Sequence, residues 1–168
     1  MDVVSEAIPA SGLRSLSGSL DIETSAEDAF ALLCAVEKWP VWLSLLRSAR
    51  RVDRKSPLTL GSEVVLRSSI PGEEEQCFEV DQLVSNFRVS LVGAYSLRRR
   101  IEFRIERKST RSRIHARISY PAYHGRLGAW FDGMRHARRL AAALNHSLAL
   151  LRGMLEQQAS PDALPIEA

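Results

Sequence analysis

Arginine, tyrosine and histidine are the residue types of this sequence that could do chemistry in an enclosed site. Arg99 alternates in phase with the apolar Ile101 and Phe103, which predicts that its side chain faces the interior of a sheet. A buried guanidinium is unfavourable without an anionic partner, so Arg99 is a candidate to bind a ligand carboxylate or phenolate, unless it reaches solvent at a strand end. Tyr120 has the inward phase of its own strand, and His124 follows in a loop. A tyrosine and a histidine near a cavity could polarise a carbonyl or move a proton.

The familiar catalytic and metal-binding patterns do not occur in the sequence. Glu79 and Asp81 share the phase of Cys77, opposite to the apolar positions of that strand, so no pair of inward carboxylates is expected. Cys34 and Cys77 lie far apart in the chain, without a histidine at metal-ligand spacing, which argues against a disulfide framework and a zinc site. No Ser-His-Asp order and no glycine-rich phosphate loop is found. We expect no metal and no cofactor, and the sequence assigns no catalytic residue.

Hydrophobic periodicity predicts the elements that must position these side chains. Ser25 and the acidic residues after it predict the start of a helix over residues 26–36, and Pro40 can open a second short helix that ends at Leu46. Apolar residues at alternating steps of four and three predict one long helix over residues 126–156. Alternation and turn signals predict strands near residues 16–22, 48–54, 62–69, 75–84, 87–92, 97–107 and 111–120. Their short connections favour antiparallel hairpins.

Basic residues are concentrated in the C-terminal part of the chain. Residues 97–152 hold 14 Lys/Arg and 3 Asp/Glu, although the whole chain has a net charge of only +3. If the first strand pairs with the last, Asp21 and Glu23 should lie near Arg113 and Arg117, which predicts a solvated, cross-paired sheet face. That face has no aromatic side chains among its arginines on which bases could stack, so no nucleic-acid partner is expected.

The length of 168 residues favours a single domain. We expect a loose N-terminal arm over residues 1–14, one domain over 15–156, and a loose tail over 157–168. The first residues lack the basic and apolar segments of a secretory signal, and no run of 18 apolar residues could form a transmembrane helix. Together with two unpaired thiols, these features predict a cytoplasmic location. A homodimer is left open.

Several local strings resemble the SRPBCC superfamily, which contains START lipid-transfer domains, Bet v 1 plant allergens and bacterial polyketide cyclase/dehydratase-like proteins. They include SGSLDIETSAEDAF, the string WPVW at 39–42, the turn LTLG at 58–61 and YHGRLGAWFDGMRHARRLAAALNHSL. The resemblance spans residues 15–156. It implies an α+β helix-grip fold, in which a seven-stranded curved antiparallel sheet, with two short helices after strand 1, wraps around one long C-terminal helix and encloses a cavity.

The superfamily's cavity carries lipids, sterols, polyketides or plant hormones in different relatives, and the resemblance brings no shared catalytic motif. Trp39 and Trp42 either fill the corner of the two short helices or form a wall of the cavity mouth. Asn145 is a polar residue close to the helix seam, and we expect it to bond to the sheet rather than to a ligand. The candidate cavity residues are Trp39, Trp42, Leu66, Phe78, Val80, Val89, Leu91, Arg99, Ile101, Phe103, Ala116, Ile118, Tyr120, Phe131, Met134, Arg138 and Asn145.

Three functions are compatible with these observations. The first, which we favour, is binding or carriage of a small hydrophobic ligand, lipid-like or polyketide/aromatic-like, in a cavity between sheet and helix. The second is a polyketide cyclase/dehydratase-like enzyme that uses Arg99, Tyr120 or His124. The third is a protein-interaction module that docks an acidic partner on the basic outer sheet face. Whether the protein is an enzyme is left open.

Overall fold

A computed structural model describes residues 4–6, 13–69, 75–94, 96–108, 111–121 and 129–159 of the chain. Within these residues no helix is long and apolar enough to cross a membrane. The elements follow one another as β1 (Val4–Glu6), β2 (Leu13–Ile22), α1 (Ala26–Cys34), the 3-10 turn η1 (Val36–Lys38), α2 (Trp39–Trp42), β3 (Leu46–Arg51), β4 (Glu63–Ser68), β5 (Glu75–Val84), β6 (Arg88–Gly93), β7 (Ser96–Lys108), β8 (Arg111–Pro121) and α3 (Ala129–Ala159).

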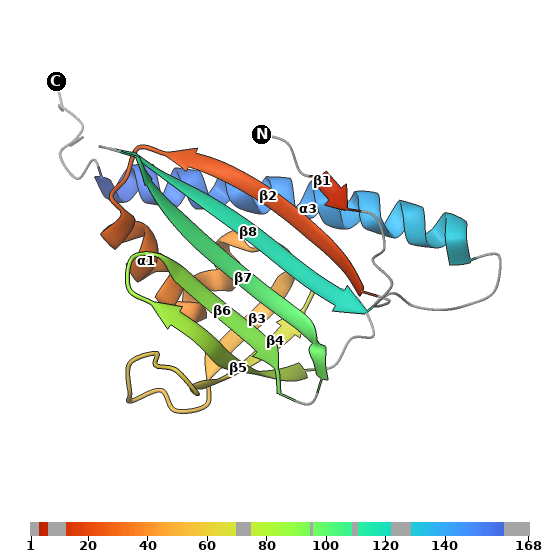
Figure 1. Ribbon diagram of the computed structural model, residues 1–168, viewed down its shortest axis with the longest axis horizontal. Helices are drawn as coiled ribbons and strands as arrows, with labels where there is room; N and C mark the ends of the chain where they lie inside the picture. The colour runs from red at the N-terminus through yellow and green to blue at the C-terminus, as the bar shows by residue number, and fades with distance from the viewer. Residues whose placement is uncertain are drawn as a thin grey trace, which may run out of the picture.

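The strands form one antiparallel sheet in the order β1-β2-β8-β7-β6-β5-β4-β3. The first long strand, β2, lies beside the last, β8, while β3 to β8 follow one another as hairpins. Figure 1 shows the long strands running together with α3 along the sheet. The predicted helix-grip α+β fold is confirmed: the seven predicted strands make up β2 to β8, and β1 adds a short eighth strand at the edge.

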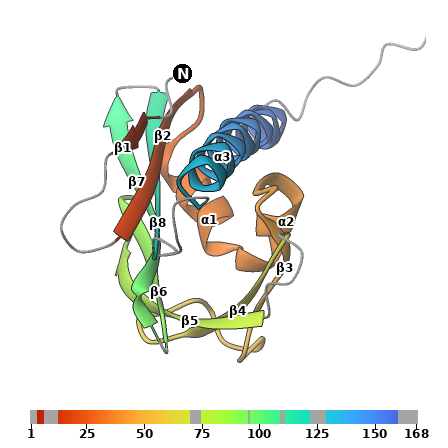
Figure 2. The ribbon, with the colours of Figure 1, turned by 90° about the vertical axis from the view of Figure 1, so that its right-hand side faces the viewer.

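The sheet is strongly curved, so that it encloses the helices instead of lying flat against them. Figure 2 shows the wall running from β2 and β8 through β5 to β3, with α1 and α2 on its inner side and α3 across the opening. Register shifts interrupt the ladders between β3 and β4, β5 and β6, and β6 and β7. Such bulges bend the bulged strand and increase its local twist, which helps a sheet to close around a core.

The two short helices turn the chain from the first strand back to the sheet. Ser25 caps α1, because its hydroxyl oxygen accepts a hydrogen bond from the Asp28 backbone N–H at 3.0 Å, as predicted. Both helices are shorter than predicted. A turn in which the Leu46 N–H donates to the Leu43 carbonyl at 2.9 Å follows α2, so Leu46 begins β3 instead of ending a helix.

Helix α3 is attached along its C-terminal half. Leu144, Leu148, Leu151 and Leu155 are fully buried, which confirms the predicted apolar stripe within the described side chains. The Thr24 hydroxyl donates to the Leu155 carbonyl at 3.4 Å, and Arg152 donates to the Asp21 carbonyl of β2 at 2.7 Å. The stripe positions Trp130, Met134 and Ala137 lie outside the side chains that the structure describes.

A serine latch, formed by Ser44 and Ser147, joins α3 to the connection between α2 and β3. The Ser44 N–H donates to the buried Ser147 hydroxyl oxygen at 2.9 Å, and Ser147 donates to the Ala143 carbonyl at 2.7 Å. The Ser69 hydroxyl after β4 donates to the Ser44 carbonyl at 2.9 Å. These bonds attach the helix to the connection before β3, whereas Thr24 and Arg152 attach it on the β2 side.

The ends of the chain differ from the sequence-based expectation. β1 lies within the predicted loose arm, where it pairs with β2 through Val4 and Ser17. β2 itself begins at Leu13, so Arg14 belongs to the sheet. α3 continues to Ala159, beyond the predicted helix end at Glu156. A three-residue strand and the last few residues of a helix have too little apolar periodicity for either to be predicted from the sequence.

Candidate functional site

One end of the interior is filled by aromatic rings, and we call Trp39, Trp42 and Phe103 the sealed end. All three side chains are fully buried. The ring centroids of Trp39 and Trp42 lie 5.3 Å and 5.6 Å from that of Phe103, both in edge-on arrangements that favour aromatic pairs. The Trp39 indole N–H donates to the Leu33 carbonyl at 2.9 Å. This end packs the short helices against the sheet, which is the first of the two roles considered for the tryptophans.

The inward faces of the strands become less buried away from the sealed end. Along β7 the exposed fraction rises from 0% at Phe103 to 7% at Ile101, and Arg99 is only partly buried. Along β8, Ala116 is 1% exposed, whereas Ile118 and Tyr120 are partly exposed. The interior therefore has an opposite, less covered end.

Two further elements show the same gradient. On β5, Val80 and Phe78 are buried and Gln76 is partly exposed. On α3, Leu144 is buried, Ala141 is partly exposed, and Arg138 is exposed. Sheet and helix thus lose their cover at the same end. We call Gln76, Arg99, Ile118, Tyr120 and Ala141 the half-buried end.

A polar row crosses the inward face of the sheet at the half-buried end. Arg14 has the inward phase of Leu16 on β2 and lies directly opposite Tyr120 of β8. The β7–β8 register pairs Arg100 with Ser119, so the next inward position places Arg99 on the other side of Tyr120. Arg99 donates to the Gln76 amide oxygen at 2.7 Å, crossing β6 to reach β5. Arg14, Tyr120, Arg99 and Gln76 thus form one row from four strands.

The Tyr120 phenol stays neutral in this environment. Desolvation by burial raises its pKa above the usual value of 10.0, and the positive charge of Arg14 only partly opposes that change. At neutral pH the hydroxyl is therefore protonated and can donate a hydrogen bond. A phenol with a raised pKa is a weak general base, so the row is better suited to holding a polar group than to removing a proton.

The Trp42 indole nitrogen and the Asn145 Oδ1 are buried polar atoms that have no hydrogen-bond partner among the described residues. Buried side-chain polar atoms are nearly always bonded, so each such atom needs an explanation. We expected Asn145 to bond to the sheet, but the structure shows no such bond for its oxygen.

The other predicted site residues, the cavity candidates and His124, fall into three groups. Leu66, Val80, Val89 and Leu91 are buried in the hydrophobic core. Arg138 is exposed. Phe131, Met134 and His124 lie outside the side chains that the structure describes.

Sequence reasoning missed Arg14 and Gln76. The alternation of Leu16, Gly18 and Leu20 extends to Arg14, and that of Val80 and Phe78 extends to Gln76, but polar residues at strand ends carry no hydrophobic signal.

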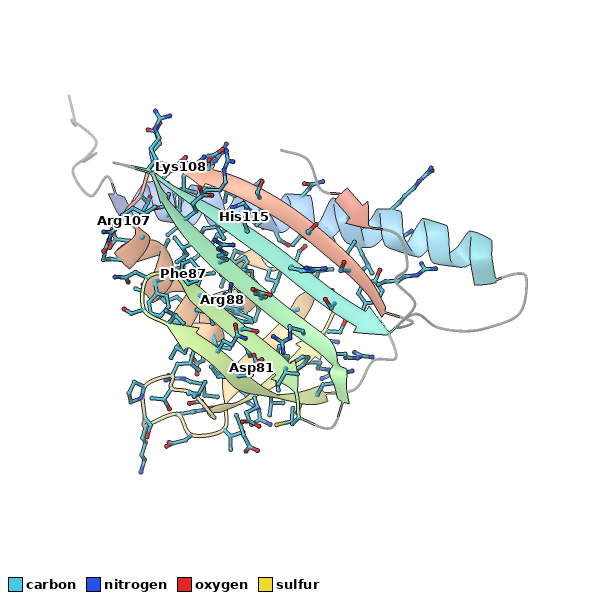
Figure 3. The ribbon with its side chains drawn as sticks, viewed as in Figure 1. Asp81, Phe87, Arg88, Arg107, Lys108 and His115 are labelled. Atoms are coloured by element: carbon cyan, nitrogen blue, oxygen red, sulfur yellow. The ribbon has the colours of Figure 1, made fainter. Side chains whose placement is uncertain are left out.

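The outer face of the same sheet is charged and internally paired. Arg113 donates two hydrogen bonds to Asp21, each 2.7 Å long, as the strand pairing predicted. Glu23 pairs with Arg111 instead of Arg117, because it lies beyond the end of β2, toward the β7–β8 turn. Figure 3 shows Asp81, Arg88 and His115 on the sheet face turned away from α3.

Further ion pairs join β7 to β5, to β6 and to helix α1. Arg100 lies 2.7 Å from Asp81, Arg88 lies 3.4 Å from Glu102, and Arg107 pairs with Glu27 of α1. The guanidinium groups of Arg88 and Arg104 both lie over the Phe87 ring, 5.3 Å and 5.1 Å from its centroid. A shallow depression of about 360 Å³ lies where small side chains face each other, lined by Ser17, Gly18, Ser19, Glu102, Arg104, His115, Ala116 and Arg117. Much of the basic charge on this face is thus balanced within the molecule.

Neither a metal centre nor a thiol site emerges from the described residues. No group of three or more His, Cys, Asp or Glu side chains among them could hold a metal ion. Cys34 and Cys77 are free thiols. Burial raises the pKa of Cys34 to about 11, and burial together with Glu63 and Glu79 raises that of Cys77. A thiol with a raised pKa is a poor nucleophile at neutral pH.

Comparison with known proteins establishes the fold. No family model matches the chain, and no curated protein matches it. Among solved structures, a START superfamily protein from Mycobacterium smegmatis has a TM-score of 0.63 and 17% identity over 86% of this chain and 98% of its own. The Zhui aromatase/cyclase from Streptomyces sp. R1128 has a TM-score of 0.64 and 13% identity over 88% and 96%.

A third solved structure, that of a protein from Thermus thermophilus, has a TM-score of 0.68 and 12% identity over 87% of this chain and 99% of its own. At such identities the likeness extends to the arrangement of the elements and not to the site residues. The chain has the helix-grip fold that START superfamily and aromatase/cyclase proteins share.

Proposed function

We propose that the protein binds a small, largely apolar molecule between the sheet and α3, at the half-buried end of the interior. The observation that carries this proposal is the gradient of burial. The inward side chains of β5, β7, β8 and α3 are all fully buried near the sealed end and only partly buried or exposed at the opposite end. A fold stabilised only by its core would gain from covering this end as well.

Apolar side chains at the half-buried end favour an apolar ligand. Ile118, Leu140 and Ala141 are partly exposed and pack against the core cluster, and Ile101 and Phe78 lie one inward position deeper. Covering apolar surface is favourable by about 25 cal/mol per Å². Binding sites for small molecules are typically apolar with a few convergent polar groups, which is the composition of this end together with the row from Arg14 to Gln76.

A buried polar atom gives further support. The Asn145 amide oxygen, one helical turn from Ala141, has no hydrogen-bond partner among the described residues and could accept from a ligand hydroxyl. Leaving such an atom without a partner in the folded protein costs about 1–3 kcal/mol. Carriage needs none of these groups to transfer a proton, which agrees with the neutral state of Tyr120.

A neutral apolar fluorophore, N-phenyl-1-naphthylamine, tests the site without relying on charge. We expect saturable fluorescence enhancement with the purified protein. Ile118→Trp places an indole in the half-buried end and should weaken binding about tenfold or more, a loss of roughly 1.4 kcal/mol. Val84→Trp makes a comparable addition at a position that is 50% exposed, and it should leave the affinity unchanged.

Native mass spectrometry on gently purified protein, followed by solvent extraction, would identify a co-purified ligand. If the wild-type protein shows no saturable binding of the fluorophore and no bound molecule, the proposal is wrong. Equal affinities of the wild type and of Ile118→Trp, with both proteins folded by circular dichroism, would place the binding site elsewhere.

A further inference from the structure

We propose that the outer face of the sheet carries a second binding site, at which a glutamate or aspartate side chain from an exposed segment of a partner protein binds beside Arg104. The site is the shallow depression of about 360 Å³ that lies over β2, β8 and β7. Arg88, Arg104 and His115 lie side by side there, and we call them the basic row. Figure 3 shows Arg88 and His115, the two ends of this row, on the sheet face turned away from α3.

The register of the sheet places the members of the basic row directly opposite one another. Arg88 of β6 is the partner of Arg104 of β7, and Arg104 is the partner of His115 of β8. Ser19 of β2 faces His115 at the end of the row. Like charges in directly opposed positions destabilise a sheet, whereas opposite charges stabilise it. The basic row is therefore not the arrangement that stability alone would favour.

The positive charge in this row that has no internal counterion belongs to Arg104. The two outer members reach carboxylates diagonally, because Arg88 lies 3.4 Å from Glu102 and His115 lies 3.3 Å from Glu106. Among the described residues no carboxylate pairs with Arg104, whose guanidinium lies over the Phe87 ring, 5.1 Å from its centroid. The ring contact limits the directions that the guanidinium can take but leaves its charge in place.

The depression beside Arg104 has room and hydrogen-bond donors for a carboxylate. Three consecutive small residues of β2, at positions 17–19, stand next to the longer side chains of β7 and β8 and leave the hollow. The Ser19 hydroxyl can donate one hydrogen bond, and a guanidinium can donate two parallel ones to a carboxylate. Arg117 and Ser17 also line the depression but already have interactions within the protein, so Arg104 supplies the charge and Ser19 the hydroxyl.

The surroundings favour an isolated acidic side chain over a polyanion. Glu102 and Glu106 lie two residues before and after Arg104 on the same face of β7, about 6.8 Å away along the strand. A nucleic acid or an anionic membrane would bring negative charge close to both carboxylates, whereas one glutamate or aspartate between uncharged neighbours avoids them. An exposed ion pair contributes little by itself, so further contacts are needed. The Phe87 side chain, 36% exposed, offers an apolar contact to a protein segment.

Nuclear magnetic resonance with the purified full chain tests the site directly. The probe is a short capped peptide with one central glutamate, one leucine and otherwise serine, and its matched control has glutamine in place of the glutamate. We expect saturable shifts of the Arg104 Nε–Hε signal and of the Ser19 and His115 backbone amides. The glutamine peptide should bind about fivefold more weakly, because an exposed ion pair contributes up to about this factor.

Variants connect the binding to Arg104. Arg104→Gln should remove the difference between the two peptides. Arg100→Gln is the matched control, because Arg100 lies four residues earlier on the same face of the same strand and pairs with Asp81 at 2.7 Å. This variant should keep the preference for glutamate. Thermal melts give a second measurement: Arg104→Gln should leave the melting temperature unchanged or raise it, since it removes the opposed charge from Arg88.

The outcomes decide the proposal in either direction. Equal binding of the two peptides, or shifts confined to other surfaces, would overturn it. An equal loss of the glutamate preference in Arg104→Gln and Arg100→Gln would show general electrostatic attraction instead of a site. A short oligothymidylate that binds more tightly than the glutamate peptide, with the same dependence on Arg104, would replace the protein segment with a nucleic acid. A melting temperature lowered more by Arg104→Gln than by Arg100→Gln would show that Arg104 serves folding.

Discussion

The sealed end and the half-buried end of the interior are built from the same strands but differ in how completely they are covered. At the sealed end, Trp39 and Trp42 cover Phe103 and leave nothing exposed. Four residues earlier on the same face of β7, Arg99 is partly exposed and bonded to Gln76. The difference shows that the inward face of one strand can be fully covered at one end and partly open at the other, depending on what lies across from it.

The largest contrast is expected in stability. Trp39→Ala should lower the free energy of unfolding by about 3–5 kcal/mol, because it empties a fully buried site and removes the hydrogen bond to Leu33. Ile118→Ala should cost less than about 2 kcal/mol, because part of this side chain remains in contact with water. Urea denaturation of both variants measures the difference. Equal losses would show that the two ends are packed alike and would remove the basis for the comparison.

A smaller effect is expected at the serine latch between α3 and the connection after α2. Ser147→Ala should destabilise the protein by about 1–2 kcal/mol, because the Ser44 N–H loses the acceptor that lies 2.9 Å away. Ser48→Ala at an exposed position on β3 serves as the control and should change stability by less than about 0.5 kcal/mol. A loss at Ser147 no larger than that of the control would mean that packing alone holds the helix in place.

The smallest effect concerns acid stability near the C-terminal end of β2, where the Asp21 carbonyl meets Arg152 of α3. Hydrogen bonds and charge from Arg113, with the charges of Lys108 and Arg152, hold the pKa of Asp21 below its usual value of 3.8 despite some desolvation. Its contribution to stability is therefore complete above pH 3.8 and is lost as the pH falls through the lower folded-state pKa. The effect is small because the carboxylate is exposed.

Thermal melts from pH 6 down to about pH 2 would test this expectation for the wild type and Asp21→Asn. The wild type should lose more stability than the variant over the acidic part of this range, and the two curves should converge at the lowest pH. Parallel curves would show that the Asp21–Arg113 pair does not contribute to folding. Glu63→Gln, which removes an exposed carboxylate from β4, serves as the control variant for Asp21→Asn.

Much of the fold could be predicted because its signals are local. The alternation on β7 and β8 indicated the inward phase of Ile101 and Ile118, and Ser25 marked the start of α1. The boundary of the second helix could not be predicted, because the apolar Leu43, Leu45 and Leu46 suit either a helix or a turn, and hydrogen bonds that include those to neighbouring segments decide between the two. Half of the polar row was predicted in the same way. Arg99 and Tyr120 lie in strongly alternating strands, whereas Arg14 and Gln76 lie at strand ends.

The sequence by itself determined which face each strand residue takes, because side chains alternate with a period of two along any strand. It therefore determined that Arg99 and Tyr120 point inward and that the basic residues beside them point outward. Only the tertiary structure decided how far along those faces the cover extends, and that Arg14 from the start of the chain lies beside Tyr120. Burial and cross-strand neighbours depend on segments that are distant in the sequence, so no local pattern contains them.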